Sequence, residues 1–302
     1  MKKLVLSLVA AASVASAAFA AEKERVVIVP CHPDDLVAAF GFCLLARDVY
    51  DLHVVDYTRG ERGCGPVNYT NGMAAAMRTA EEEAVCADLG AKLYWLDQPD
   101  GVALVTEEAV DRLSEILNEL KPRAVIGHWP VDIHGDHTMA GAAMLKAVCN
   151  VSTKDYKPEV YFFDQPYQSK AMTPDVYLDI TEVAARKSAL KKHYFCQGAG
   201  RAMIAKGVSS MEEVAAIKAE YQRKLDEDKE PKRKGHSRME CCDYYFGMHT
   251  SNLNIGARVE PYRAMFPRQQ GQETVFDRLK PCALRMTSRF QGLKTGKWAE
   301  VR

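Results

Sequence analysis

Short β-branched segments alternate with longer helix-like segments through the first half of this 302-residue chain. The hydrophobic spacing predicts strands at 26–29, 53–58, 93–96 and 124–127, and helices at 37–48, 72–89, 107–120 and 138–149. This β-α-β-α order favours an α/β fold, with a Rossmann-like, mostly parallel sheet flanked by helices. In such sheets ligands bind outside the carboxyl ends of the strands, so the residues that follow each strand are the first candidates for a functional site.

The second half of the chain is less regular. Strands are expected at 160–163 and 176–180 and helices at 183–193 and 211–229, and the periodicity is weak beyond residue 250. We expect residues 21–200 to form the main domain. Residues 201–302 are expected to form a helical and irregular C-terminal extension packed on the same domain.

The first twenty residues have the pattern of a cleaved signal peptide. Lys2 and Lys3 precede an apolar run that ends in the triplet Ala18-Phe19-Ala20. A transmembrane anchor is the alternative, but the strongly apolar part is short and rich in alanine. We therefore expect cleavage after Ala20, a secreted or periplasmic protein and no stable membrane insertion after cleavage. The 40 basic and 40 acidic residues cancel, and this balance gives no support to a nucleic-acid partner.

The nine cysteines are scattered without the spacing of a disulfide framework or a CxxC site. Most of them are expected to be small buried hydrophobic residues. The sequence favours no particular pairing.

Two clusters of metal-ligating residues follow predicted strands. His32-Pro33-Asp34-Asp35 comes after the strand at 26–29, and His134-Gly135-Asp136-His137 comes soon after the strand at 124–127. Histidine and aspartate suit Zn²⁺, which in catalytic sites takes three protein ligands and keeps one open position. Each cluster alone could be a turn that caps a helix. Together, at the carboxyl ends of two strands, they indicate a catalytic metal site.

At this point the sequence resembles the PIG-L/LmbE-like zinc-dependent de-N-acetylases. The resemblance covers roughly residues 25–200, in the correct order. The matching stretches are the two clusters above, Thr58-Arg59-Gly60-Glu61-Arg62-Gly63, Arg78-Thr79-Ala80-Glu81 running on to Leu89-Gly90, and a weaker echo from Leu178 to Gln197.

The resemblance implies a zinc-dependent hydrolase that removes acetyl from an N-acetylated amino sugar, of the N-acetylglucosamine type. It implies that His32, Asp35 and His137 ligate Zn²⁺. Asp34 would be the general base, His134 would stabilise the oxyanion or act as the acid, and Asp136 would orient His134. Zinc would make its bound water acidic enough to be deprotonated near neutral pH.

Three further residues are expected to contact substrate or support the site. The arginine that matches Arg78 contacts the sugar in this family, and the alternative is a surface ion pair with Glu81 or Glu82. Glu61 lies in a glycine-flanked loop. His193 is expected to reach the site, with a favourable charge at a helix C-terminus as the alternative.

Other interpretations keep the fold but change the activity. One is an amidase that acts on a non-acetyl amide, and another is a catalytically inactive carbohydrate-binding member of the family. Leu36 supports the second, because it stands where the family usually has an acid. A nucleotide-binding enzyme is disfavoured because no GxGxxG or GxxxxGK[ST] pattern follows a strand. The sequence does not indicate an oligomeric state.

Overall fold

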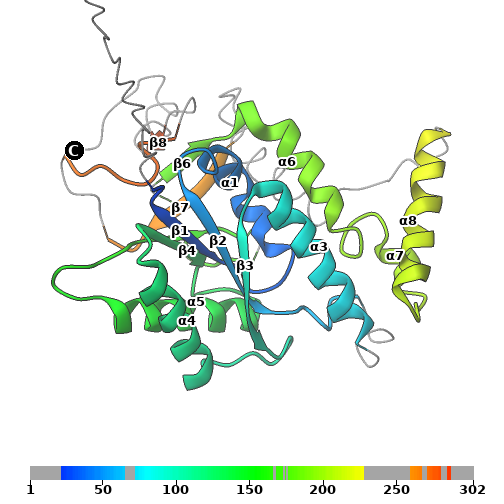
Figure 1. Ribbon diagram of the computed structural model, residues 1–302, viewed down its shortest axis with the longest axis horizontal. Coiled ribbons are helices and arrows are strands. Elements are labelled where there is room, and N and C mark those ends of the chain that lie inside the picture. The colour runs from blue at the N-terminus through cyan, green and yellow to red at the C-terminus, as the bar shows by residue number, and fades with distance from the viewer. Residues whose placement is uncertain are drawn as a thin grey trace, which may run out of the picture.

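A single mixed sheet with helices on both faces forms the centre of the molecule (Figure 1). The computed structural model describes residues 22–64, 72–165, 168–172, 174, 176–227, 259–266, 271–279 and 284–286. The sheet has eight strands in the order β3-β2-β1-β4-β5-β7-β6-β8. The first five strands of this order are parallel, and the last three are antiparallel to their neighbours.

The parallel strands agree closely with the segments expected from the sequence. They are β1 (Arg25–Val29), β2 (Asp51–Thr58), β3 (Lys92–Gln98), β4 (Ala124–His128) and β5 (Glu159–Phe163). The antiparallel strands are β6 (Val176–Asp179), β7 (Val259–Ala264) and β8 (Leu284–Met286). The chain order reverses between β1 and β4, which is where doubly wound sheets form their binding crevice.

Helices cover the two faces of the sheet separately. One face packs against α1 (Phe40–Ala46), α3 (Met73–Leu89) and α6 (Ala184–Leu190), and the other against α4 (Glu107–Leu120) and α5 (Gly135–Val151). Alternation along β1 explains this division, because Val26 and Ile28 enter the first core whereas Val27 and Val29 enter the second. The strand is buried on both faces and therefore has a continuous apolar sequence.

The remaining helices are short or peripheral. They are α7 (Arg201–Ile204), α8 (Met211–Asp226) and the 3-10 helices η1 (Asp35–Ala39), η2 (Thr181–Val183) and η3 (Lys191–His193). A third apolar cluster joins α8 to α3 and to the segment before α7. In Figure 1 α8 lies at one end of the molecule, beyond α3.

The helix expected at 183–193 is split into η2, α6 and η3, and two other boundaries that bear on the site also differ from the sequence-based expectation. The helix expected at 37–48 is a 3-10 turn over Asp35–Ala39 followed by α1. The helix expected at 138–149 begins earlier, at Gly135, so Asp136 and His137 lie in its first turn. Both shifts bring the metal-ligating clusters to helix starts at the carboxyl edge of the sheet, where first-turn N–H groups and the helix dipole favour carboxylates.

The C-terminal extension contributes strands to the same sheet. β7 lies between β5 and β6 and pairs antiparallel with both, and β8 pairs with β6. The weak periodicity beyond residue 250 did not predict these strands. The expected signal peptide at 1–20 lies outside the described residues. None of the helices in the described part of the chain has the length and apolar character needed to cross a bilayer.

Candidate active site and metal centre

The two clusters predicted from the sequence meet at the carboxyl ends of β1 and β4. These strands are neighbours, with Val29 of β1 paired to Gly127 of β4. The turn after β1 carries His32, Asp34 and Asp35, and the segment after β4 leads through Asp132 into α5. Parallel pairing therefore brings together residues about one hundred positions apart in the chain.

Asp35 lies at the centre of the cluster. Its Oδ2 is 3.0 Å from Nδ1 of His32 and 3.2 Å from Nε2 of His137. The backbone N–H of His32 also donates to Oδ2, and the side-chain amide of Gln165 donates to Oδ1. Burial of the Asp35 carboxyl raises its pKa, but the neighbouring charged imidazole of His137 holds that pKa well below the usual range.

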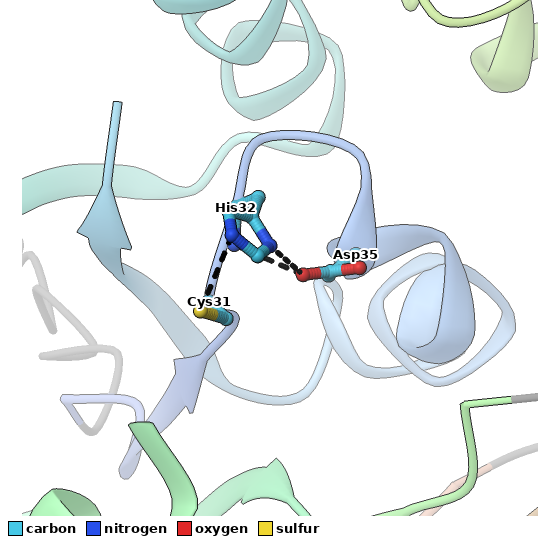
Figure 2. A group of neighbouring side chains, drawn as sticks. All are labelled: Cys31, His32 and Asp35. Atoms are coloured by element: carbon cyan, nitrogen blue, oxygen red, sulfur yellow. Dashed lines mark hydrogen bonds and ion pairs between the residues drawn. The ribbon is translucent and has the colours of Figure 1, made fainter. Parts of the chain in front are cut away.

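The two ring nitrogens of His32 contact different carboxylates. Figure 2 shows it between Cys31 and Asp35, on the turn that follows β1. Nδ1 faces Asp35, whereas Nε2 lies 3.2 Å from Asp100 and 3.3 Å from Asp136. The Cys31 sulfur is 3.7 Å from Nε2, on the opposite side of the ring from Asp35. Since the two nitrogens point in different directions, a metal held by Asp35 and Nδ1 would not also take the Cys31 sulfur.

The side chains present fit a zinc-type donor set. Nδ1 of His32 and Nε2 of His137 both lie within 3.2 Å of Oδ2 of Asp35, and two imidazoles with one carboxylate are an ordinary catalytic zinc set. His137 turns its other nitrogen, Nδ1, to Asp132 at 3.4 Å. A carboxylate behind a ligating histidine fixes the tautomer and raises ligand basicity. In the absence of metal, Asp35 and Asp132 raise the pKa of His137 to about 9, despite its burial.

Asp34 lies beside this donor set in an unusual backbone conformation. Its φ of 106° places it in the left-handed region, which L-residues other than glycine, asparagine and aspartate seldom adopt. The carboxylate forms an ion pair with Arg78, whose guanidinium also donates to the carbonyls of Pro33 and Gly60. Strain of this kind is held by surrounding contacts and is common at functional sites. Here Arg78 holds the Asp34 carboxylate at the pocket wall.

Arg78 is a buried member of the pocket. Its side chain is 4% exposed, and it contacts Asp34 rather than Glu81 or Glu82, so the alternative of a surface ion pair is wrong. Gly63 makes room for it, because a Cβ at that position would overlap the guanidinium. The need for close approach explains the glycine in the loop after β2.

His134 faces the same pocket with a free nitrogen. Its Nδ1 is buried and has no hydrogen-bond partner among the described residues. The ring stacks on His137 with centroids 4.5 Å apart. Desolvation lowers the pKa of His134, followed by the charges of His137 and His32. A neutral imidazole near the donor set can accept or donate a proton.

The structure corrects two of the predicted roles. Asp136 does not hydrogen-bond His134; it accepts from the backbone N–H groups of Gly101 and Ala103 and contacts His32. These donors, with His32, lower the pKa of Asp136 to about 2 despite its desolvation. His193 lies outside the pocket, because η3 carries it to the end of α3, where it binds Asp88 at 2.8 Å.

Glu61 supports the site from behind the pocket wall. Its Oε1 accepts from the backbone N–H of Asp100 at 2.7 Å, while Asp100 accepts from the backbone N–H of Arg62 at 2.7 Å. These bonds join the loop after β2 to the loop after β3. Asp100 is thereby held against Nε2 of His32.

Sequence reasoning missed Asp100 and His128. Asp100 follows the strand at 93–96 in a Pro-Asp-Gly turn, and its position after a strand was an available signal. His128 ends β4, and its Nε2 accepts from the backbone N–H of Cys31 at 3.0 Å. Burial lowers the pKa of His128 to about 4, so the ring is neutral. With Nε2 engaged, His128 lies beside the donor set without offering it a free lone pair.

A pocket of about 260 Å³ lies over these groups. His32, Asp34, Asp35, His134 and His137 line it, so five of the six residues predicted for catalysis and metal binding share one cavity. The sixth, Asp136, contacts His32 from outside the lining. The pocket therefore brings together a donor set, a carboxylate and an imidazole.

Comparison with known proteins finds a family match over part of the chain. Residues 26–148 match the family model PIG-L, described as GlcNAc-PI de-N-acetylase. These residues belong to the PIG-L family. The resemblance inferred from the sequence is thereby confirmed. No curated protein matches the chain.

Several solved structures share this fold along most of the chain. The 4-carboxy-2-hydroxymuconate hydratase from Pseudomonas putida has a TM-score of 0.60 at 22% identity, over 83% of this chain and 100% of that one. The N,N'-diacetylchitobiose deacetylase from Pyrococcus horikoshii has a TM-score of 0.55 at 18% identity, over 80% of this chain and 84% of that one. A deacetylase from teicoplanin biosynthesis has a TM-score of 0.52 at 16% identity, over 81% of this chain and 100% of that one. These similarities confirm the expected α/β fold class.

Proposed function

We propose that the chain is a metal-dependent N-deacetylase that removes the acetyl group from an N-acetylated amino sugar of the N-acetylglucosamine type. The observation that carries the proposal is the convergence of His32 Nδ1, Asp35 Oδ2 and His137 Nε2 beside Asp34 in one pocket. The family model is described as a de-N-acetylase, and two of the similar structures are deacetylases. The third is a hydratase, so the fold alone does not choose the reaction.

We assign the metal to His32, Asp35 and His137 and propose Zn²⁺ as the ion. When bound, zinc would supply Lewis acidity and a water that is deprotonated near neutral pH. Asp34 would accept the proton of the attacking water, and Arg78 would hold the Asp34 carboxylate in place. His134 would donate through its unpartnered Nδ1 to one of two atoms of the substrate amide. One is the carbonyl oxygen, which becomes negatively charged, and the other is the nitrogen, which leaves.

The test is acetate release together with metal content. Purified protein is assayed on N-acetylglucosamine and its oligomers, before and after chelation and after zinc is restored. We expect chelator-sensitive release, and Asp34→Asn should lower kcat about 10²–10⁴-fold while zinc stays bound. Asp111→Asn is the matched control, because this exposed aspartate on α4 lies outside the pocket.

Three results would overturn this assignment. Full activity of Asp34→Asn with zinc retained would refute the role of Asp34. Release of a different carboxylic acid, with no acetate released from any sugar, would favour the amidase interpretation. Sugar binding with bound metal and no turnover would favour a carbohydrate-binding protein.

Export is part of the proposal and depends on the first twenty residues alone. A basic start, an apolar run and Ala18-Phe19-Ala20 favour cleavage after Ala20. Expression of the full chain in a bacterial host, followed by N-terminal sequencing of the periplasmic fraction, tests it. A mature chain that begins at Ala21 is expected, and a cytosolic chain that keeps Lys2 and Lys3 would contradict export.

A further inference from the structure

The pocket wall carries arginines in addition to the residues proposed to bind the metal. Arg62, Arg78 and Arg201 line it, against the carboxylates of Asp34, Asp35 and Asp100, which contact Arg78 or His32. The three arginines match the three carboxylates in number, before the histidines and a metal are counted. A divalent cation at the proposed centre would therefore make the pocket net positive, which favours an anionic ligand.

Arg201 is distinct among these arginines. It begins α7, is exposed, and its guanidinium makes no hydrogen bond or ion pair with any residue in the described ranges. It also lies outside residues 26–148, the part that matches the family model. Among the described lining residues no phenylalanine, tyrosine or tryptophan is present, so this part of the wall offers no such ring for stacking on a neutral sugar.

We propose that Arg201 binds a carboxylate or phosphate group of the substrate, which makes the substrate an anionic N-acetyl amino sugar. This inference rests on the proposed deacetylase function and narrows its substrate class. A guanidinium binds both kinds of oxyanion through paired N–H donors. The pocket volume of about 260 Å³ suits one sugar unit with its charged substituent better than an extended oligosaccharide.

The experiment compares N-acetylglucosamine, its 6-phosphate and N-acetylmuramic acid. We expect kcat/KM to be at least tenfold higher for one or both anionic sugars, and Arg201→Gln to lower this preference about tenfold. Arg186→Gln is the matched control, because Arg186 is exposed on α6 and outside the pocket. The sugar that shows the preference distinguishes phosphate from carboxylate.

Ligand binding gives a readout that does not need turnover. In thermal unfolding, the preferred anionic sugar should raise the Tm of the zinc-loaded protein more than N-acetylglucosamine does, and Arg201→Gln should remove the difference. Acetate release without any preference for anionic sugars would overturn the role of Arg201 and leave the deacetylase proposal standing. Absence of acetate from all three sugars would count against deacetylation, and the Tm comparison would still decide the role of Arg201.

A different observation concerns two cysteines at the pocket wall. Cys64 ends the described part of the loop after β2, and Cys196 lies after η3; both are buried in the cluster that joins α3 to α8. The amide nitrogen of Gln197, the residue after Cys196, lies 4.0 Å from the Cys64 sulfur. Their neighbours Gly63 and Gln197 line the pocket, and the Gln197 amide donates to the Gly63 carbonyl at 2.6 Å.

We infer that Cys64 and Cys196 form a disulfide when the chain folds in the presence of a thiol–disulfide oxidant. Each thiol loses a proton and an electron as the S–S bond forms, and one molecule of oxidised glutathione takes them up and becomes two reduced molecules. Both thiols are buried, so we place the reaction during folding rather than in the folded protein. The bond would fix the 60–64 loop to the segment that carries Gln197.

Refolding the full chain with a mixture of reduced and oxidised glutathione tests the bridge. After alkylation and proteolysis, mass spectrometry should find one cross-linked peptide pair, Cys64 with Cys196. Cys64→Ser should remove it, and Cys86→Ser, a change at another buried cysteine, should keep it. A reductant should lower the Tm of the refolded protein by about 5 °C, but not that of Cys64→Ser. Full alkylation of both cysteines after refolding would overturn the inference.

Discussion

A buried carboxylate ties the C-terminal extension to α1, the helix that follows η1. Glu260 of β7 is 1% exposed and binds the ammonium group of Lys187 in α6 at 2.7 Å. Its oxygens also accept from the backbone N–H groups of Gly41 and Phe42, at 2.6 Å and 2.8 Å, and from the Tyr262 hydroxyl. Glu260 thus satisfies N–H groups at the start of α1 that have no partner within the helix.

Removing either charge should destabilise the fold strongly. Lys187→Met leaves the Glu260 carboxylate buried without its cation, and Glu260→Gln leaves the Lys187 ammonium without its anion. Each change should lower the free energy of unfolding by about 3–5 kcal/mol, the usual cost of breaking a buried pair from one side. The double variant removes both charges, so its loss should be at least about 2 kcal/mol smaller than the sum of the single losses.

Urea unfolding of all four proteins at pH 7, followed by circular dichroism, measures this coupling. Arg186→Met is the control, since this exposed neighbour on α6 should change the free energy of unfolding by no more than about 0.5 kcal/mol. If the loss in the double variant equals the sum of the two single losses within about 0.5 kcal/mol, Lys187 and Glu260 are not energetically coupled, and the prediction is wrong.

Three further predictions concern the site and its surroundings. Burial raises the pKa of Glu82 to about 8, so the native state keeps a proton that the unfolded chain loses above about pH 4.5, and stability falls as pH rises through that window. Glu82→Gln should therefore raise the Tm at pH 8 but not at pH 4.5, and an equal effect at both would contradict this pKa. Asp132→Asn should weaken zinc binding about 10–100-fold in a chelator competition, because His137 loses its carboxylate partner, and an unchanged affinity would refute that role. Gly63→Ala should lower kcat/KM at least about tenfold by displacing Arg78. Gly90→Ala strains the backbone, because φ is +70° there, but its Cβ contacts nothing and should leave kcat/KM unchanged.

Most of the parallel sheet and the central donor set could be predicted from the sequence. Strand and helix periodicity is a local property of the sequence. Four of the five parallel strands are segments that are rich in Val and Ile or buried on both faces. Because strands β1 and β4 both end at one edge of the sheet, the clusters that follow them were expected to meet there.

The roles of individual side chains were less predictable. Asp136 and His193 were assigned by their position in a pattern, yet Asp136 turns to the loop after β3 and His193 to Asp88. A side chain selects its partner by direction and distance, and the spacing of residues in a motif fixes neither. His128 carried no pattern of its own, since its contact with Cys31 exists only when β1 and β4 are paired.

By itself, the sequence determined the α/β class, the resemblance to the PIG-L family that the match over residues 26–148 confirms, and the residues His32, Asp34, Asp35 and His137, which line one pocket. The tertiary structure decided how Arg78 holds Asp34, that β7 and β8 of the extension enter the sheet, and that Cys64 and Cys196 share one apolar cluster. The physical reason is the range of the interactions. Periodicity and motifs record contacts within one element and its flanking turns, whereas these contacts join segments that become neighbours only when the chain is packed.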